Sequence, residues 1–159
     1  MNNPAAEIID IMREKKLTLG TVESATGGLI AHLITNVPGS SDVFQGSIVS
    51  YSNEIKMKLV GVKAATLKKY GAVSAQVAEE MAASGRKTLG VDICIADTGI
   101  AGPTGATPEK PVGLFYLGLS HYGGTYNRKH LFTGTREENK QQAALTALAW
   151  IREYFSDLK

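Results

Sequence analysis

Helical and strand-like patterns alternate along the first half of the chain, and this alternation restricts the possible folds more than any other feature. Residues Leu17–Glu23 and Phe44–Ser52 form short runs rich in apolar and β-branched side chains, which predict two strands. A helix from about Thr26 is expected between them, ended by Pro38 and Gly39. A first helix is indicated by apolar residues at helical spacing, namely Ala5, Ile8, Ile9 and Met12. Such alternation predicts a domain in which helices are layered on a sheet.

The second half of the chain predicts one long helix and an antiparallel pair of strands. Ser74 is a good cap for a helix over Ala75–Leu89, and Ile93–Ala96 reads as a short buried strand. A hairpin around Gly123 and Gly124 adds antiparallel pairing, so the sheet of the expected layered α/β domain should be mixed. The pattern leaves the strand order open. The other expected elements are a helix over Asn53–Leu59 capped by Asn53, a helix over Ala65–Tyr70, a loop over Gly99–Pro111, and hairpin strands over Val112–Ser120 and Thr125–Phe132. A last helix is expected to begin with a capping box of Thr135 and Glu138 and to bury Ala144, Leu148, Ile151 and Phe155.

Composition and charge exclude several classes of protein. The 159 residues contain no internal repeat or linker, so they are expected to form one domain over residues 1–159. The apolar fraction of 43% indicates a globular chain, and a net charge of +2 is too small for a nucleic-acid footprint. The single cysteine, Cys94, cannot form an internal disulfide, and no apolar run has the length of a membrane span. We therefore expect a cytoplasmic soluble protein, and this charge is compatible with phosphate-bearing small molecules as ligands.

The first candidate site is the stretch ESATGG at residues 23–28, where a strand is expected to give way to a helix. The hydroxyl of Ser24 would be held rigidly there, and free N–H groups at the helix start could stabilise an oxyanion or a phosphate. The arrangement is similar in logic to a nucleophile elbow, although the sequence is not G-x-S-x-G. On spacing alone, a simple helix cap by Ser24 or Thr26, with Gly27 and Gly28 permitting close packing, is the favoured interpretation.

The second candidate site is the polar cluster from Tyr51 to Lys56, at a strand end that enters a helix. Lys56 could act as a base if burial or a neighbouring positive charge lowers its pKa. A serine needs such a partner to become nucleophilic, and serine–lysine pairs are a known variant. The alternative is a solvated helical lysine beside Lys58, which is far more common for a single lysine.

The third candidate site is the glycine-rich segment from Thr98 to Gly105, followed by the stretch KPVG at residues 110–113. Glycines allow the backbone to approach a ligand closely, and long loops in compact domains are often functional. Arg136 at the start of the last helix could bind a phosphate or be an ordinary surface charge. The histidines His32, His121 and His130 show no metal-ligand spacing with one another or with Cys94, so no metal site is expected.

Six segments in order resemble the CinA carboxy-terminal domain family, which includes stand-alone nicotinamide-nucleotide amidases. They are ESATGG, PGSSDVF, SYSNEIKMKLVGV, YGAVSAQVAEEMA, TGIAGPTGATPEKPVG and FTGTRE, spread from about residue 20 to 140. Each alone is weak, but six in order are highly specific. The resemblance implies a three-layer α/β/α fold, a homo-oligomer with a dimer as the expected form, and no cofactor. The implied activity is hydrolysis of nicotinamide mononucleotide to nicotinate mononucleotide and ammonia, without a metal.

The resemblance also implies roles for individual residues. Ser24 is the implied nucleophile, Lys56 its base and Tyr51 an assisting hydroxyl near the pair. The loop after Thr98 and Arg136 correspond to the nucleotide-binding surface. The full set assigned to substrate binding is Thr26, Gly27, Gly28, Asn53, Thr98, Gly99, Ala101, Gly102, Gly105 and Arg136.

Two residues depart from the pattern of the family. Ala25 stands where a cysteine is frequent, which should matter little if Ser24 is the nucleophile. Asp97 stands where an apolar or small residue usually precedes the threonine, and a carboxylate beside the loop could weaken phosphate binding or change the substrate. Two alternatives stay open. Asp97 could shift the specificity to a related amide, and the competence-related name of the family suggests a non-catalytic nucleotide-binding or regulatory module. Retention of both Ser24 and Lys56 favours catalysis, because a binding module needs neither.

Overall fold

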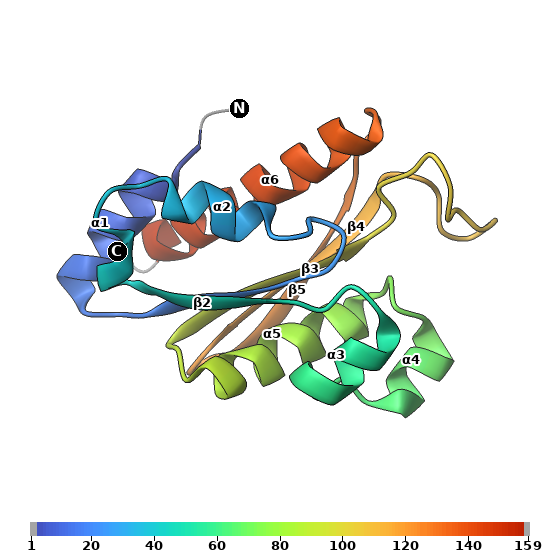
Figure 1. The fold of residues 1–159 in the computed structure, drawn as a ribbon, viewed down its shortest axis with the longest axis horizontal. Helices are drawn as coiled ribbons and strands as arrows, with labels where there is room; N and C mark the ends of the chain where they lie inside the picture. Colours follow the sequence, from blue (N-terminus) through green and yellow to red (C-terminus); the bar gives the residue numbers. More distant parts are fainter. Residues whose placement is uncertain (1–2, 158–159) are drawn as a thin grey trace.

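The computed structural model describes residues 3–157, which form one mixed five-stranded sheet between two layers of helices (Figure 1). The strand order is β2-β1-β3-β4-β5. Strand β1 pairs in parallel with β2 and β3, while β3–β4 and β4–β5 are antiparallel pairs. The strands are β1 Leu19–Glu23, β2 Phe44–Val49, β3 Ile93–Gly99, β4 Leu114–His121 and β5 Gly124–Leu131. This confirms the predicted mixed sheet and supplies the order that the sequence left open.

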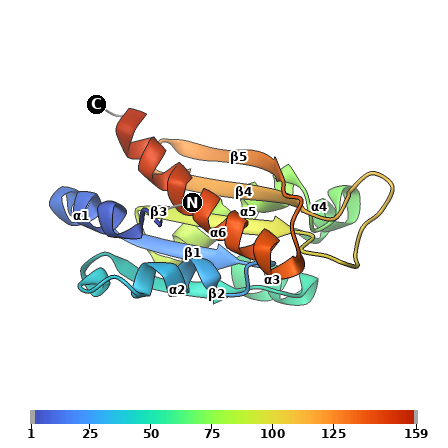
Figure 2. The same ribbon diagram turned by 90° about the horizontal axis from the view of Figure 1, so that it is seen from above.

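The helices lie in two layers, one on each face of the sheet (Figures 1 and 2). One layer contains α1 Ala5–Lys15, α2 Leu29–Thr35 and α6 Arg136–Asp157, and a short 3-10 helix, Ser40–Asp42, precedes β2. The other layer contains α3 Asn53–Val60, α4 Ala64–Tyr70 and α5 Ala75–Leu89. Among residues 3–157, no helix is long and apolar enough to cross a membrane.

The packing of α5 against the sheet depends on small residues. Ser74 caps the helix by accepting a hydrogen bond from the N–H of Val77. A Cβ on Gly85 would lie 2.2 Å from a methyl group of Val22, so only glycine allows this close approach to β1. The predicted apolar faces of α1 and α6 are also buried, at Ala5, Ile8, Ile9, Met12, Ala144, Leu148, Ile151 and Phe155.

Several predicted boundaries differ from the structure for local reasons. Helix α2 begins at Leu29 rather than near Thr26, because residues 25–28 form a turn in which Gly27 and Gly28 have positive φ angles. The cap of α3 is Ser52, whose hydroxyl accepts from the N–H of Ile55, and not Asn53. Strand β3 continues to Gly99, three residues beyond the predicted end, because the pairing with β4 extends that far.

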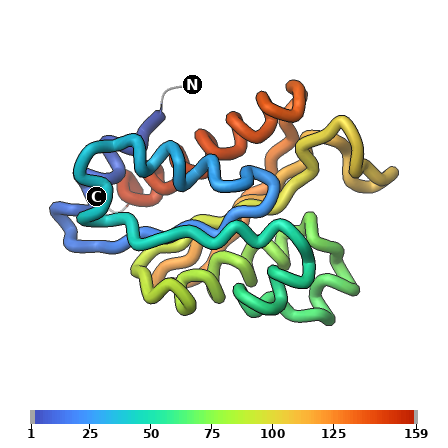
Figure 3. Tube along the Cα trace, in the orientation of Figure 1, coloured from blue at the N-terminus to red at the C-terminus, as the bar shows by residue number. Residues whose placement is uncertain are grey.

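The carboxyl ends of the three parallel strands lie at the same end of the molecule (Figure 3). The chain leaves β1 toward the α2 layer but leaves β2 toward the α3 layer, so the connections diverge to opposite faces of the sheet (Figure 1). In open α/β sheets, ligands bind where adjacent connections separate in this way. The long loop after β3, residues 100–113, extends beyond the sheet at this end (Figure 2).

Candidate active site

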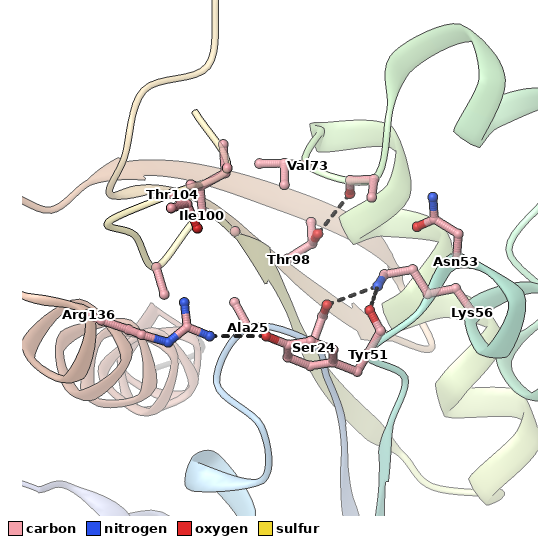
Figure 4. A pocket seen from close by; sticks show the side chains of 14 residues that line it. Ser24, Ala25, Tyr51, Asn53, Lys56, Val73, Thr98, Ile100, Thr104 and Arg136 are labelled. Atoms are coloured by element: carbon pink, nitrogen blue, oxygen red, sulfur yellow. Dashed lines mark hydrogen bonds between the residues drawn. The ribbon is translucent and has the colours of Figure 1, made fainter. Parts of the chain in front are cut away.

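A cavity of about 240 Å³ opens where the connections that follow β1 and β2 diverge. It is bounded by the turn after β1, the start of α3, the end of β3 and the first residue of α6 (Figure 4). The three sequence segments therefore converge in space. The predicted site residues that line it are Ser24, Tyr51, Asn53, Lys56, Thr98, Gly99, Ala101, Gly105 and Arg136.

The Ser24–Lys56 pair lies at the bottom of this cavity. The Nζ atom of Lys56 is 2.9 Å from Oγ of Ser24, 2.8 Å from the carbonyl oxygen of Ser50 and 3.0 Å from that of Tyr51. The Lys56 side chain has only 1% of its surface exposed, which rules out a solvated helical lysine. Among the described residues it has no salt-bridge partner.

Burial favours the neutral form of Lys56. Loss of hydration lowers the pKa of Lys56 below its ordinary 10.5, and the negative charge of Asp97 partly opposes this by raising it. A neutral amine can donate its two hydrogens to the carbonyls of Ser50 and Tyr51, which leaves its lone pair for the hydroxyl hydrogen of Ser24. The contacts therefore suit a base that accepts the proton of Ser24.

Tyr51 contributes to the pair in a way that the sequence did not indicate. Its main-chain carbonyl, and not its hydroxyl, contacts Lys56. The hydroxyl accepts a hydrogen bond from Nη2 of Arg136 at 3.1 Å, and the ring extends toward Arg136 (Figure 4). The expected assisting hydroxyl beside Ser24 and Lys56 is thus replaced by a contact that positions Arg136. Nη1 of Arg136 donates to the carbonyl of Gly102 at 2.8 Å.

Buried carboxylates accept hydrogen bonds from most N–H groups of the Ser24 turn. Asp97 accepts from the amides of Ser24 and Thr26, both at 3.1 Å. Glu23 accepts from the amides of Gly28, Ile30 and Ala31 at the start of α2. The predicted anion site at this helix start is therefore wrong, because the side chain of Glu23 already fills it. For the described residues, the amide of Ala25 is the one in residues 24–28 with no hydrogen-bond acceptor.

Asp97 also differs from its expected role. The sequence placed its carboxylate beside the loop, where it could disturb phosphate binding. In the structure it is fully buried on β3 and faces the Ser24 turn. Burial raises the pKa of Asp97 to about 6, against the opposing effect of its hydrogen bonds.

Four residues assigned to substrate binding do not line the cavity: Thr26, Gly27, Gly28 and Gly102. The hydroxyl of Thr26 is directed to the buried carboxylates of Glu23 and Asp97. At Gly102, φ is +86° and a Cβ would lie 2.4 Å from a methyl group of Val112. The fold of the loop therefore requires glycine at position 102.

Ala72 and Val73 line the cavity although the sequence gave them no role. They precede α5, and the hydroxyl of Thr98 ties them to β3 by donating to the carbonyl of Ala72 at 2.8 Å. Their segment belongs to the matching stretch YGAVSAQVAEEMA, which was the available signal. Within residues 3–157, no three His, Cys, Asp or Glu side chains come together as a group able to hold a metal ion.

The fold and the cavity together define a class of protein: a three-layer α/β/α domain with a buried serine–lysine pair at the carboxyl end of its parallel strands. The chain belongs to the CinA family, because the family model described as the CinA C-terminal domain matches residues 1–155. This confirms the resemblance that the sequence motifs indicated.

Relatives and solved structures agree with this membership. A CinA-like protein of Kosmotoga olearia is 50% identical over 145 residues, which are 91% of this chain and 35% of that protein. A CinA-like protein of Thermotoga neapolitana is 43% identical over 162 residues, 99% of this chain and 39% of the relative. The chain thus spans little more than a third of the length of these relatives.

Two crystal structures show the same fold. The competence/damage inducible protein CihA from Agrobacterium tumefaciens is 36% identical, with a TM-score of 0.91 over 94% of this chain and 92% of that one. The competence damage-inducible protein A from Klebsiella pneumoniae is 29% identical, with a TM-score of 0.95 over 99% of this chain and 100% of that one. The α/β/α arrangement is therefore that of the CinA superfamily.

Proposed function

We propose that this protein is an amidohydrolase that uses Ser24 as nucleophile and Lys56 as general base. The observation that carries the proposal is the 2.9 Å separation of Oγ of Ser24 from Nζ of a lysine that is 1% exposed. A lysine without a salt-bridge partner is expensive to bury, and a nucleotide-binding module has no need of one. A serine nucleophile needs a base with a lowered pKa, which a desolvated amine provides.

The reaction would proceed through an acyl-enzyme. Oγ of Ser24 attacks the carboxamide carbon while its proton passes to Lys56, and the carbonyls of Ser50 and Tyr51 hold the resulting ammonium group. The unpartnered amide of Ala25 follows the nucleophile directly, which is the position of an oxyanion donor in nucleophile elbows. Lys56 then returns the proton to the leaving nitrogen, so that ammonia departs. Water, deprotonated by the same amine, then attacks the acyl carbon, the bond to Oγ of Ser24 breaks to release the acid, and Lys56 returns the proton to Oγ.

The proposed substrate is nicotinamide mononucleotide, which would yield nicotinate mononucleotide and ammonia. The family resemblance supports this choice, and the cavity offers complementary groups. Arg136 at its mouth uses two donors on Tyr51 and Gly102, and its remaining donors can serve a phosphate. Because Ser52 caps α3, the side chain of Asn53 is not needed for capping, and it lines the cavity as a neutral donor and acceptor. An amidase for a related amide remains the second enzymatic candidate.

Ammonia release from nicotinamide mononucleotide by the purified protein tests the proposal. Wild type should release ammonia and Ser24→Ala should not, while both give the same circular dichroism spectrum. Ser41→Ala is a matched control, since Ser41 is exposed in the 3-10 helix and away from the cavity. Full activity in a folded Ser24→Ala variant would reject the nucleophile assignment.

The alternative of a non-catalytic nucleotide-binding module has a different outcome in the same assay. Wild type would then bind the nucleotide in calorimetry but release no ammonia from it. The serine mechanism also requires no metal, so dialysis against a strong chelator should leave turnover unchanged. Activity lost on dialysis and restored by a divalent ion would contradict the mechanism. The homo-oligomer and the cytoplasmic location remain predictions.

A further inference from the structure

The hydroxyl of Thr26 lies between two buried carboxyl groups beneath the Ser24–Lys56 pair. Its Oγ1 is 2.7 Å from Oε1 of Glu23 and forms a short hydrogen bond with Oδ1 of Asp97. Glu23 and Asp97 are fully buried, and Thr26 is 1% exposed. The three side chains therefore form one continuous network without access to solvent.

The number of hydrogens in this network is too small for two ionised carboxylates. An ionised carboxylate only accepts hydrogen bonds, and a threonine hydroxyl has a single hydrogen to donate. Thr26 can donate to Glu23 or to Asp97, but not to both. The contact on the other side needs a hydrogen that comes from a protonated carboxyl group. Two buried negative charges this close would also repel each other strongly.

The hydrogen-bond donors indicate which carboxyl group holds the proton. Glu23 accepts from three amides of α2 and from the hydroxyl of Thr21, with Ser47 within 3.3 Å, so its charge is well compensated. Asp97 accepts from only two amides. The order consistent with all contacts is a protonated Asp97 that donates to Thr26, which in turn donates to Glu23.

We propose that Glu23, Thr26 and Asp97 share one proton between two carboxyl groups, and that Asp97 is a positioning residue that fixes the Ser24 turn and, once ionised, favours the charged form of Lys56. The effect on catalysis rests on the proposed amidase function, but the proton itself does not. When Asp97 is neutral, Lys56 loses its proton more readily and is available as a base. When Asp97 ionises, its negative charge stabilises the ammonium form.

The charged groups around Asp97 come from three neighbouring elements. Glu23 at the end of β1 adds a negative charge and, like burial, favours the neutral form of Asp97. Lys56 on α3 is the cation that senses Asp97. On α6, Arg136 lies at the mouth of the cavity, and the amine of Lys140 lies beside Gly27.

Infrared titration of the wild-type protein tests the shared proton directly. At pH 5 we expect the carbonyl stretch of one protonated carboxyl group, which disappears as the pH rises through about 6. Labelling the aspartate side-chain carboxyl carbon with ¹³C should shift this band, which assigns it to an aspartate. Asp97→Asn should lack it, and Asp92→Asn, an exposed control before β3, should keep it. A wild-type protein without a protonated aspartate at pH 5 overturns the proposal.

The positioning role is tested by the titration of Lys56, followed through the ¹³C shift of its Cε. Its midpoint should lie at lower pH in Asp97→Asn than in wild type and should be unchanged in Asp92→Asn. A purely structural Asp97 would leave the midpoint unchanged, and that result overturns the positioning role. If the protein released no ammonia but both titrations behaved as expected, the amidase proposal would fail and the proton network would stand.

Discussion

Replacing Lys56 with methionine is the sharpest perturbation of the proposed site. Methionine keeps the length and apolar character of the buried side chain but removes the amine that contacts Ser24, Ser50 and Tyr51. The nucleophile stays in place, because Asp97 and not Lys56 holds its turn. The variant therefore separates the loss of the base from the loss of the fold.

The expected effects on turnover and stability differ in size. A general base typically contributes about 10²- to 10⁴-fold to rate, so kcat should fall by that factor. The carbonyls of Ser50 and Tyr51 lose a donor, at about 1–3 kcal/mol for each one left without a partner. Removal of a buried amine offsets part of this loss. We expect the unfolding free energy to fall by roughly 1–3 kcal/mol, and the fold to be retained.

The pH dependence gives a second measurement of the same base. Only the neutral amine can accept the proton of Ser24, so wild-type kcat should rise with pH through the pKa of Lys56. Since burial lowers that pKa, the midpoint of this acidic limb should lie below 10.5. Ammonia release at saturating nicotinamide mononucleotide, measured across pH, records both effects.

Lys58→Met is the matched control, because Lys58 is exposed on the same helix. It should retain wild-type kcat and the same acidic limb. Near-normal kcat in Lys56→Met, or equal losses in both lysine variants, would refute the assignment of Lys56 as base.

Three further outcomes follow from the structure. Gly102→Val should lower the melting temperature, because the new side chain would collide with Val112 and residue 102 has a positive φ angle. An unchanged melting temperature with weaker substrate binding would support the ligand role first expected for this glycine. Tyr51→Phe should raise KM and change kcat little, since it removes the hydrogen bond to Arg136 but keeps the main-chain carbonyl of residue 51. A hundredfold fall of kcat in steady-state kinetics would contradict this prediction. Because the pKa of Asp97 rises from 3.8 to about 6 on folding, the folded state binds this proton more tightly, and the unfolding free energy should fall by about 2 kcal/mol between pH 4 and pH 7. Urea titrations at several pH values should show that this contribution is absent in Asp97→Asn, and an identical pH dependence in both proteins would exclude it.

The sequence by itself determined most of the local structure, because helices, caps and buried faces depend on residues close together in the chain. The helix Ala75–Leu89 with its Ser74 cap is found as predicted, and so are the buried faces of α1 and α6. Turn and boundary details were less accurate. Asn53 was expected to cap α3 because its residue type favours caps, but its equally suitable neighbour Ser52 does so.

The sequence motifs also indicated which segments to bring together, but through family resemblance rather than through periodicity. Considered from spacing alone, Ser24 was a helix cap and Lys56 a solvated lysine. Both of those interpretations depend on what surrounds the side chain. Burial and contacts between residues 32 positions apart are properties of the packed chain, so a local pattern cannot reveal them.

Only the tertiary structure decided how the parts of the site act on one another. The strand order β2-β1-β3 places the ends of three strands together, and no local pattern encodes which strands are neighbours. That order brings Asp97 on β3 against the Ser24 turn after β1, across 73 residues of sequence. From the sequence, Asp97 was an unusual carboxylate near a loop. In the structure it is fully buried and connected through Thr26 to Glu23, which makes it part of the proposed proton-sharing network. A charge state depends on the surrounding solvent and partners, and these exist only after the strands have paired.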